Sequence, residues 1–158
     1  MSIKIINGNL FDTDANIICH QVNCKGVMGS GVAKQVKERY PQAYEAYKKL
    51  CDETRNKRHL LGTAQAVFIN NPDKTVYNLF GQERYGSNGL FTSYEALQEC
   101  FTRVVRGKFD GDTYAMPFRI GCDRGGGDWD IVYKMLEETF AGCDLSLYKL
   151  GVDFGKRL

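Results

Sequence analysis

The sequence predicts an α/β fold, a three-layer α/β/α sandwich with a mixed, mostly parallel central sheet. Short β-rich runs alternate with helical stretches, and most connections are long enough to join parallel strands. Two glycine-rich turns, at 23–33 and 120–129, each follow a run of apolar residues. Because ligands collect at the carboxyl ends of the strands in such sheets, these turns mark the expected binding edge.

The first elements are two strands and two helices. Residues 3–6 and 17–22 predict strands, and the first glycine turn opens a helix over about 31–39. Pro41 ends that helix, because the residue before a proline resists helical geometry. The same proline suits the first turn of a second helix, over about 41–51.

The later elements are a hairpin, a helix, a strand, a second helix and a closing strand. The hairpin strands are expected over 63–69 and 75–80, and the helix after them over 92–107. A strand over 113–116, a helix over 128–140 and a strand over 145–150 follow. Thr92 or Ser93 can cap the first of these helices, and Asp128 can cap the second.

Length and composition predict one soluble domain over residues 1–158. Hydrophobic residues make up 43% and charged residues 25%, and the net charge of +2 does not by itself indicate a polyanion partner. No apolar run approaches the ~20 residues needed to cross a membrane, and the N-terminus lacks a signal-peptide pattern. We therefore expect a cytoplasmic monomer with no membrane partner.

The six cysteines lie far apart in the sequence, without a Cys-x-x-Cys pair. We expect most of them to be reduced core residues. Cys19, His20 and Cys24 are the only residues of metal-ligand type that lie close together in the sequence. No second pair of cysteines or histidines has the spacing of zinc ligands, so we expect no metal. We expect no cofactor either. Cys24 and Cys122 lie within the glycine turns, where a thiol nucleophile is a further alternative.

The two glycine turns have the composition of phosphate-binding loops. Glycine lacks the Cβ that keeps a backbone amide away from an anion, and a loop that opens a helix adds unpaired amides. Neither turn has the spacing of a P-loop or of the dinucleotide fingerprint. Two such loops in one small domain predict two neighbouring phosphates, as in a diphosphate sugar.

Four segments in order resemble the macrodomain family of ADP-ribose-binding modules. They are Gly-Asn-Leu-Phe at 8–11, Ile-Cys-His-Gln-Val-Asn at 18–23, Gly-Ser-Gly-Val-Ala at 29–33, and the loop at 120–129. The last segment is the most specific, since its glycines, aspartate and tryptophan coincide with the family's pattern in register. The resemblance extends to about Leu150, and the first loop is most similar to the branch with ADP-ribosyl-glutamate hydrolases and ADP-ribose 1″-phosphate phosphatases.

The resemblance implies a set of ligand-binding residues. They are Asn9, Leu10, Asn23, Gly29, Ser30, Gly31, Val32, Gln82, Gly121, Cys122, Asp123, Arg124, Gly125, Gly126 and Tyr148. Asn9 stands where the family has an acid that contacts adenine, and Asn23 would contact the distal ribose. Tyr148 would lie against adenine or be a plain structural tyrosine, and Phe154 is a second stacking candidate.

The catalytic candidates are Asn23, Asp123 and His20. Gln82 occupies the position of the family's lysine nucleophile, and an amide cannot form a Schiff base. Asp123 is either a general base that activates water or the partner of Arg124 or Arg119 in an ion pair. His20 is either catalytic or a satisfied buried histidine.

The resemblance implies an enzyme that binds ADP-ribose and removes a substituent from its distal ribose with water. It would act as an ADP-ribose 1″-phosphate phosphatase or as a mono-ADP-ribosyl hydrolase. The expected partners are ADP-ribose or an ADP-ribosylated small molecule, protein or nucleic acid. The alternative is a reader module that binds ADP-ribose without turnover.

Overall fold

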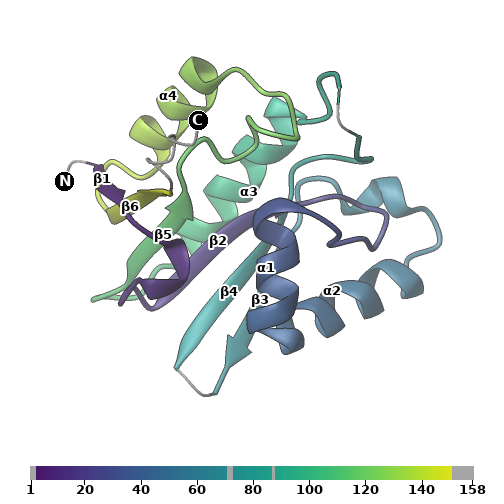
Figure 1. The fold of residues 1–158 in the computed structure, drawn as a ribbon, viewed down its shortest axis with the longest axis horizontal. Coiled ribbons are helices and arrows are strands. Elements are labelled where there is room, and N and C mark those ends of the chain that lie inside the picture. Colours follow the sequence, from purple (N-terminus) through teal and green to yellow (C-terminus); the bar gives the residue numbers. More distant parts are fainter. Residues whose placement is uncertain (1–2, 71–72, 87, 151–158) are drawn as a thin grey trace.

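The computed structural model describes residues 3–70, 73–86 and 88–150, and this part of the chain contains one six-stranded sheet (Figure 1). Its strands are β1 (Lys4–Asn7), β2 (Ile17–Val22), β3 (Ala64–Ile69), β4 (Lys74–Phe80), β5 (Thr113–Pro117) and β6 (Asp144–Lys149). Their order is β1-β6-β5-β2-β4-β3, and every neighbouring pair is parallel except the β3–β4 hairpin. The predicted mixed, mostly parallel sheet is confirmed.

Four α-helices in the described ranges form the two outer layers. They are α1 (Gly31–Arg39), α2 (Pro41–Glu53), α3 (Tyr94–Arg106) and α4 (Trp129–Thr139). Helices α1 and α2 cover one face of the sheet, and α3 and α4 cover the other (Figure 1). The longest helices have 13 residues, and none in the described part of the chain is long and apolar enough to cross a membrane.

Alternation along β2 divides the core into two clusters. Ile18 and Val22 face α1 and α2, whereas Ile17 and Cys19 face α3 and α4. All six cysteines are buried, form no disulfide and lie within these two clusters.

The helix boundaries follow the proline and capping signals closely. Helix α1 has the predicted bounds, and α2 continues past the expected end to Glu53. Two short 3₁₀ helices, η1 (Leu10–Asp12) and η2 (Lys57–Leu60), were not predicted. Each begins after an asparagine, Asn9 or Asn56, whose side chain accepts a hydrogen bond from an amide two residues later.

Candidate functional site

A cleft of about 600 Å³ opens where β2, β4 and β5 end. Its volume lies within the range of roughly 300–1,000 Å³ that is common for small-molecule sites. The walls come from both glycine-rich loops, the start of α1 and the segment after β4. Both loops therefore meet at the carboxyl edge of the sheet, as the alternation of elements predicted.

Most of the predicted site residues line this cleft. Those that line it are His20, Asn23, Gly29, Ser30, Gly31, Val32, Gln82, Gly121, Asp123, Arg124 and Gly125. Of the other described candidates, Cys122 is buried in the core on the α3 and α4 side, and Gly126, Asn9, Leu10 and Tyr148 lie outside the lining.

The first glycine loop is held from behind by one buried hydroxyl group. Tyr47 of α2 accepts hydrogen bonds from the amides of Gly26 (3.1 Å) and Val27 (3.0 Å). Its own O–H lies 2.8 Å from both the main-chain oxygen and Oδ1 of Asn23. The amide of Lys25 also donates to Asn23 Oδ1, and Asn23 Nδ2 donates to the carbonyl of Val27, both at 2.9 Å. The turn before the predicted phosphate site is thus fixed by a closed set of hydrogen bonds.

Helix α1 begins at the cleft without a side-chain cap. Among the described α-helices, Ser93 caps α3 and Asp128 caps α4, whereas Ser30 accepts no amide at the start of α1. In the described structure, the amides of Gly29 and Ser30 also have no protein acceptor. A helix start with unsatisfied amides carries a partial positive charge and suits an anion.

The second glycine loop is held through its carbonyl groups. Thr92, which is 4% exposed, donates its hydroxyl to the oxygen of Gly121 at 2.6 Å. The amides of Phe91 and Thr92 donate to the oxygen of Gly125 at 2.8 and 3.0 Å. A Cβ on Gly125 would collide with Thr92 Oγ1 and approach the oxygen of Gly121 to 2.7 Å, so this glycine permits the close approach.

The anchored carbonyls leave amides of the second loop available. Within the described ranges, the amides of Gly121, Asp123, Arg124 and Gly125 have no protein acceptor, and all four residues line the cleft. Consecutive unpaired amides in a glycine loop form an anion-binding concavity.

Asp123 pairs with Arg119, which is one of the two ion pairs that the sequence allowed. Arg119 Nε lies 3.1 Å from Asp123 Oδ1, and Arg119 Nη2 donates to the oxygen of Cys122. Arg119 has a φ of +66°, and it is the only non-glycine residue with positive φ in the described part. The Asp123 side chain remains 74% exposed, so the pair is a weak surface contact.

Gln82, at the position of the family lysine, is held by its neighbours. Gln21 Nε2 donates to Gln82 Oε1 at 2.6 Å and to Thr92 Oγ1 at 2.9 Å, and Gln82 Nε2 donates to the oxygen of Arg84 at 2.7 Å. This chain of contacts connects the ends of β2 and β4 to the second glycine loop.

His20 lines the cleft and is 1% exposed; its Nε2 is hydrogen-bonded, whereas its Nδ1 is buried with no hydrogen-bond partner among the described residues. Its Nε2 lies 2.6 Å from Asn78 Oδ1. Because Asn78 Nδ2 donates to Ala43 O and to Gln65 Oε1, the Asn78 oxygen faces His20, and His20 Nε2 carries the proton. Burial lowers the pKa of His20 to about 4, so its ring is neutral at pH 7.

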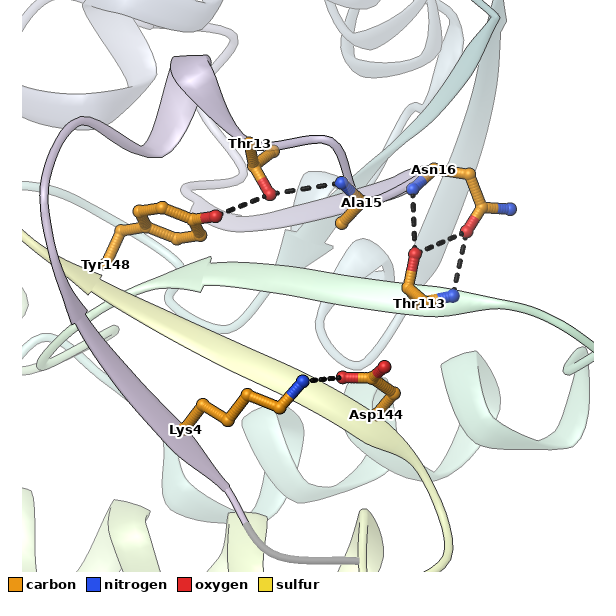
Figure 2. Close-up of polar contacts among 7 residues, drawn as sticks. All are labelled: Lys4, Thr13, Ala15, Asn16, Thr113, Asp144 and Tyr148. Atoms are coloured by element: carbon orange, nitrogen blue, oxygen red, sulfur yellow. Dashed lines mark hydrogen bonds and ion pairs between the residues drawn. The ribbon is translucent and has the colours of Figure 1, made fainter.

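The predicted adenine contacts lie on the β1–β6 side of the cleft, outside its lining. Tyr148 pairs in register with Pro117, which lines the cleft. The Tyr148 hydroxyl donates to Thr13 Oγ1 at 2.9 Å (Figure 2). Asn9 caps η1, and Leu10 is buried. Phe154 lies outside the described residues.

The geometry does not favour a thiol nucleophile. Burial raises the pKa of Cys24 to about 12 and that of Cys122 to about 11. Both groups are therefore thiols at neutral pH, and a thiol is a poor nucleophile. In the described part of the chain, no group of three or more His, Cys, Asp or Glu side chains could hold a metal ion.

Sequence reasoning missed the two hydroxyl groups that anchor the loops. Tyr47 lies in the Ala43, Tyr47, Cys51 stripe of α2, and such a stripe predicts only a buried helix face. The sequence allows Thr92 or Ser93 as the cap of α3; Ser93 is the cap, and the Thr92 side chain donates to the loop instead. Gln21 lies on β2, where strand alternation gives no indication of its amide contacts.

Comparison with known proteins adds a family and several relatives. A family model described as Macro domain matches residues 19–136. A Mycobacterium tuberculosis protein named DNA ADP-ribosyl glycohydrolase is 31% identical over 141 residues, which cover 85% of this chain and 37% of that protein. The chain thus spans little more than a third of the length of that relative.

Two further proteins are similar to this chain. A protein of Aspergillus oryzae named ADP-ribose 1″-phosphate phosphatase is 45% identical over 53 residues, covering 33% of this chain and 26% of that protein. The solved macrodomain of Mycobacterium tuberculosis DarG superposes with a TM-score of 0.76 and 29% identity, covering 93% of this chain and 97% of that one.

Proposed function

The chain belongs to the Macro domain family, and on that premise we propose that its cleft binds ADP-ribose and removes a substituent from the distal ribose with water. One observation carries the proposal: an uncapped helix start and a second loop of unpaired amides face one cleft. The names of two relatives, an ADP-ribosyl glycohydrolase and an ADP-ribose 1″-phosphate phosphatase, support the choice of ligand.

In the proposal each glycine loop takes one phosphoryl group of the ligand. The amides of Gly29, Ser30 and Gly31 bind one group at the positive end of α1, and the unpaired amides of Gly121, Asp123, Arg124 and Gly125 bind the other. Asn23 then contacts the distal ribose from the end of β2.

The proposed reaction is a direct attack by water. The water oxygen forms a bond to the anomeric carbon as the bond from that carbon to the substituent breaks, or a bond to the terminal phosphorus as the bond from phosphorus to the ribose oxygen breaks. The proton taken from water is passed to the departing group. Among the described residues that line the cleft, Asp123 alone carries a carboxylate, and in the proposal it accepts the proton of the attacking water. Because Gln82 has an amide and no amine, a covalent intermediate of the kind that a lysine forms is excluded at this position.

A second candidate function is a reader of ADP-ribose. It is favoured by Gln82, whose amide is held by Gln21 and Arg84, and by the ion pair that occupies Asp123. In a reader both loops would bind the ligand, and no group would activate water.

The decisive experiment combines calorimetry with a product assay. The protein is titrated with ADP-ribose and then incubated with ADP-ribose 1″-phosphate, an ADP-ribosylated glutamate peptide and ADP-ribosylated DNA. We expect binding and release of product from one of the three substrates, with an Asp123→Asn variant slower by about 10²-fold. Asp110→Asn, which makes the same charge change outside the cleft, should keep the wild-type rate.

The outcomes separate the two functions. Tight binding without product from any substrate identifies a reader. No binding by the wild-type protein overturns both functions, and an Asp123→Asn variant as fast as Asp110→Asn removes Asp123 from the mechanism.

A further inference from the structure

We propose that Tyr47 is a positioning residue whose buried hydroxyl makes Asn23 a pure hydrogen-bond donor toward the ligand. The inference deepens the proposed function and rests on it, because the ligand group facing Asn23 is taken to be the distal ribose of ADP-ribose.

The hydrogen bonds of Tyr47 direct its single proton toward Asn23. The side chain is 0% exposed, and its ring packs 5.6 Å from the ring of Phe80. Its oxygen accepts from the amides of Gly26 and Val27, which uses its acceptor capacity. The remaining proton faces Asn23, where the main-chain oxygen and Oδ1 both lie at 2.8 Å.

The amide of Asn23 can have only one orientation in this environment. Lys25 N–H is a donor, so the atom that it contacts is Oδ1, and the Val27 carbonyl is an acceptor, so the atom that contacts it is Nδ2. The amide of Lys25 uses one lone pair of Oδ1, and the Tyr47 O–H, which is shared with the main-chain oxygen of Asn23 at the same distance, faces the other. One Nδ2 proton remains without an acceptor in the described structure, and Asn23 lines the cleft.

A chemical consequence follows for recognition. Asn23 offers the ligand one N–H and no carbonyl, so it recognises a ligand oxygen with a free lone pair, such as a ribose hydroxyl acting as acceptor. Without the Tyr47 hydroxyl, Oδ1 loses a donor and the amides of Gly26 and Val27 lose their acceptor. The Asn23 amide is then no longer held in this orientation.

The test measures affinity for ADP-ribose and for ADP, which lacks the distal ribose. Tyr47→Phe keeps the ring and removes the hydroxyl. The matched control is Tyr44→Phe on the same helix: the Tyr44 ring lies 6.4 Å from the Tyr47 ring, and its hydroxyl has no hydrogen-bond partner in the described part. We expect Tyr47→Phe to raise the Kd for ADP-ribose about tenfold and the Kd for ADP less than about threefold. Tyr44→Phe should change neither.

A double-mutant cycle distinguishes positioning from general support of the loop. In an Asn23→Ala background, Tyr47→Phe should change the Kd for ADP-ribose by less than about twofold, because its effect passes through Asn23. The proposal would be overturned if the fold-changes in Kd of the two single variants multiply in the double variant. It would also be overturned if Tyr47→Phe weakens ADP and ADP-ribose binding equally, or if its Kd values equal those of Tyr44→Phe.

A measurement on the wild-type protein covers the case in which Tyr47→Phe does not fold. In NMR spectra, one of the two Asn23 Nδ2 protons should shift on addition of ADP-ribose, and neither should shift with ADP. Equal shifts of both protons, or of none, would contradict a fixed donor. A wild-type protein that binds neither nucleotide overturns the proposed function and this inference together, whereas binding with an unaffected Tyr47→Phe overturns the inference alone.

Discussion

The two glycine-rich loops of the cleft are anchored by hydroxyl groups that act in opposite directions. Tyr47 accepts from the amides of the first loop, whereas Thr92 donates to the Gly121 carbonyl of the second. The first anchor uses up amides at 26–27, and the second leaves the amides of its loop unpaired. In the proposed function, the two halves of the site would therefore bind anions by different means.

The first loop depends on a helix end and the second depends on its own backbone. Helix α1 starts without a side-chain cap, so its amides remain available beside Gly29 and Ser30. Helix α4 is capped by Asp128, which accepts from the amide of Asp130, so the second site consists of loop amides alone. This difference predicts that the second loop tolerates less change.

The largest effect is expected from Gly125→Ala in the second loop. The added Cβ would collide with Thr92 and the Gly121 carbonyl, so the anchored carbonyl must move and the loop amides with it. Loss of several charge-assisted hydrogen bonds should raise the Kd for ADP-ribose by about 10²-fold or more in calorimetry. Gly142→Ala, where a Cβ meets nothing within 4 Å, is the control. An affinity like that of Gly142→Ala would show that the second loop does not carry the ligand.

An effect of comparable size, on stability rather than on binding, is expected from acid, and local unfolding should begin at α2 behind the first loop. His20 contacts Asn78, which bonds to Ala43 on the same helix as Tyr47. Its pKa falls from 6.5 to about 4 on folding, because burial disfavours the charged ring. The unfolded chain thus binds more protons, so the free energy of unfolding should fall as pH drops from about 6.5 to 4, by up to about 3 kcal/mol, and level off below.

The measurement is urea unfolding across this pH range with two variants. His20→Asn should flatten the pH dependence, whereas His59→Asn, which changes an exposed histidine, should retain it. If the His20→Asn curve keeps the wild-type slope, the acid sensitivity arises elsewhere. Hydrogen exchange at low pH should also show earlier loss of protection in α2 than in α3.

The smallest effect is expected from Ser30→Asp at the start of α1, and its two consequences have opposite signs. A carboxylate can cap the free amides and should stabilise the protein by about 0.5–1 kcal/mol. It should also weaken ADP-ribose binding, because it occupies amides meant for the phosphate and repels its charge. Thermal unfolding and calorimetry measure the two changes. Ser30→Ala removes a hydroxyl that caps nothing and should alter neither, so a Ser30→Asp variant that binds as tightly as Ser30→Ala would place the phosphate away from α1.

Local chemistry made much of the fold predictable. Pro41 set the boundary between α1 and α2, Asp128 capped α4 as expected, and glycine-rich turns after β2 and β5 marked the cleft. These signals act over a few residues, so a sequence can display them directly. The number and alternation of the elements then led to the mostly parallel sheet.

The contacts that shape the site were not predictable because they join distant residues. Tyr47 lies 24 residues from Asn23, and Thr92 lies 29 residues from Gly121. A buried tyrosine in a helix stripe and a threonine before a helix have ordinary local explanations, and only the packed fold brings their hydroxyls to the loops. The sequence likewise allows Asp123 to pair with Arg119 or Arg124, and the loop conformation selects Arg119.

In the proposed function, the uncapped start of α1 would make the ligand a component of the architecture. In the absence of an anion, water must satisfy the first amides of this helix, and a bound phosphoryl group would replace that water with a fixed charge. The nucleotide sugar would then satisfy the first amides of α1 and so complete this helix. The rigidity of the α1–α2 layer would therefore increase with the fraction of protein that has ligand bound.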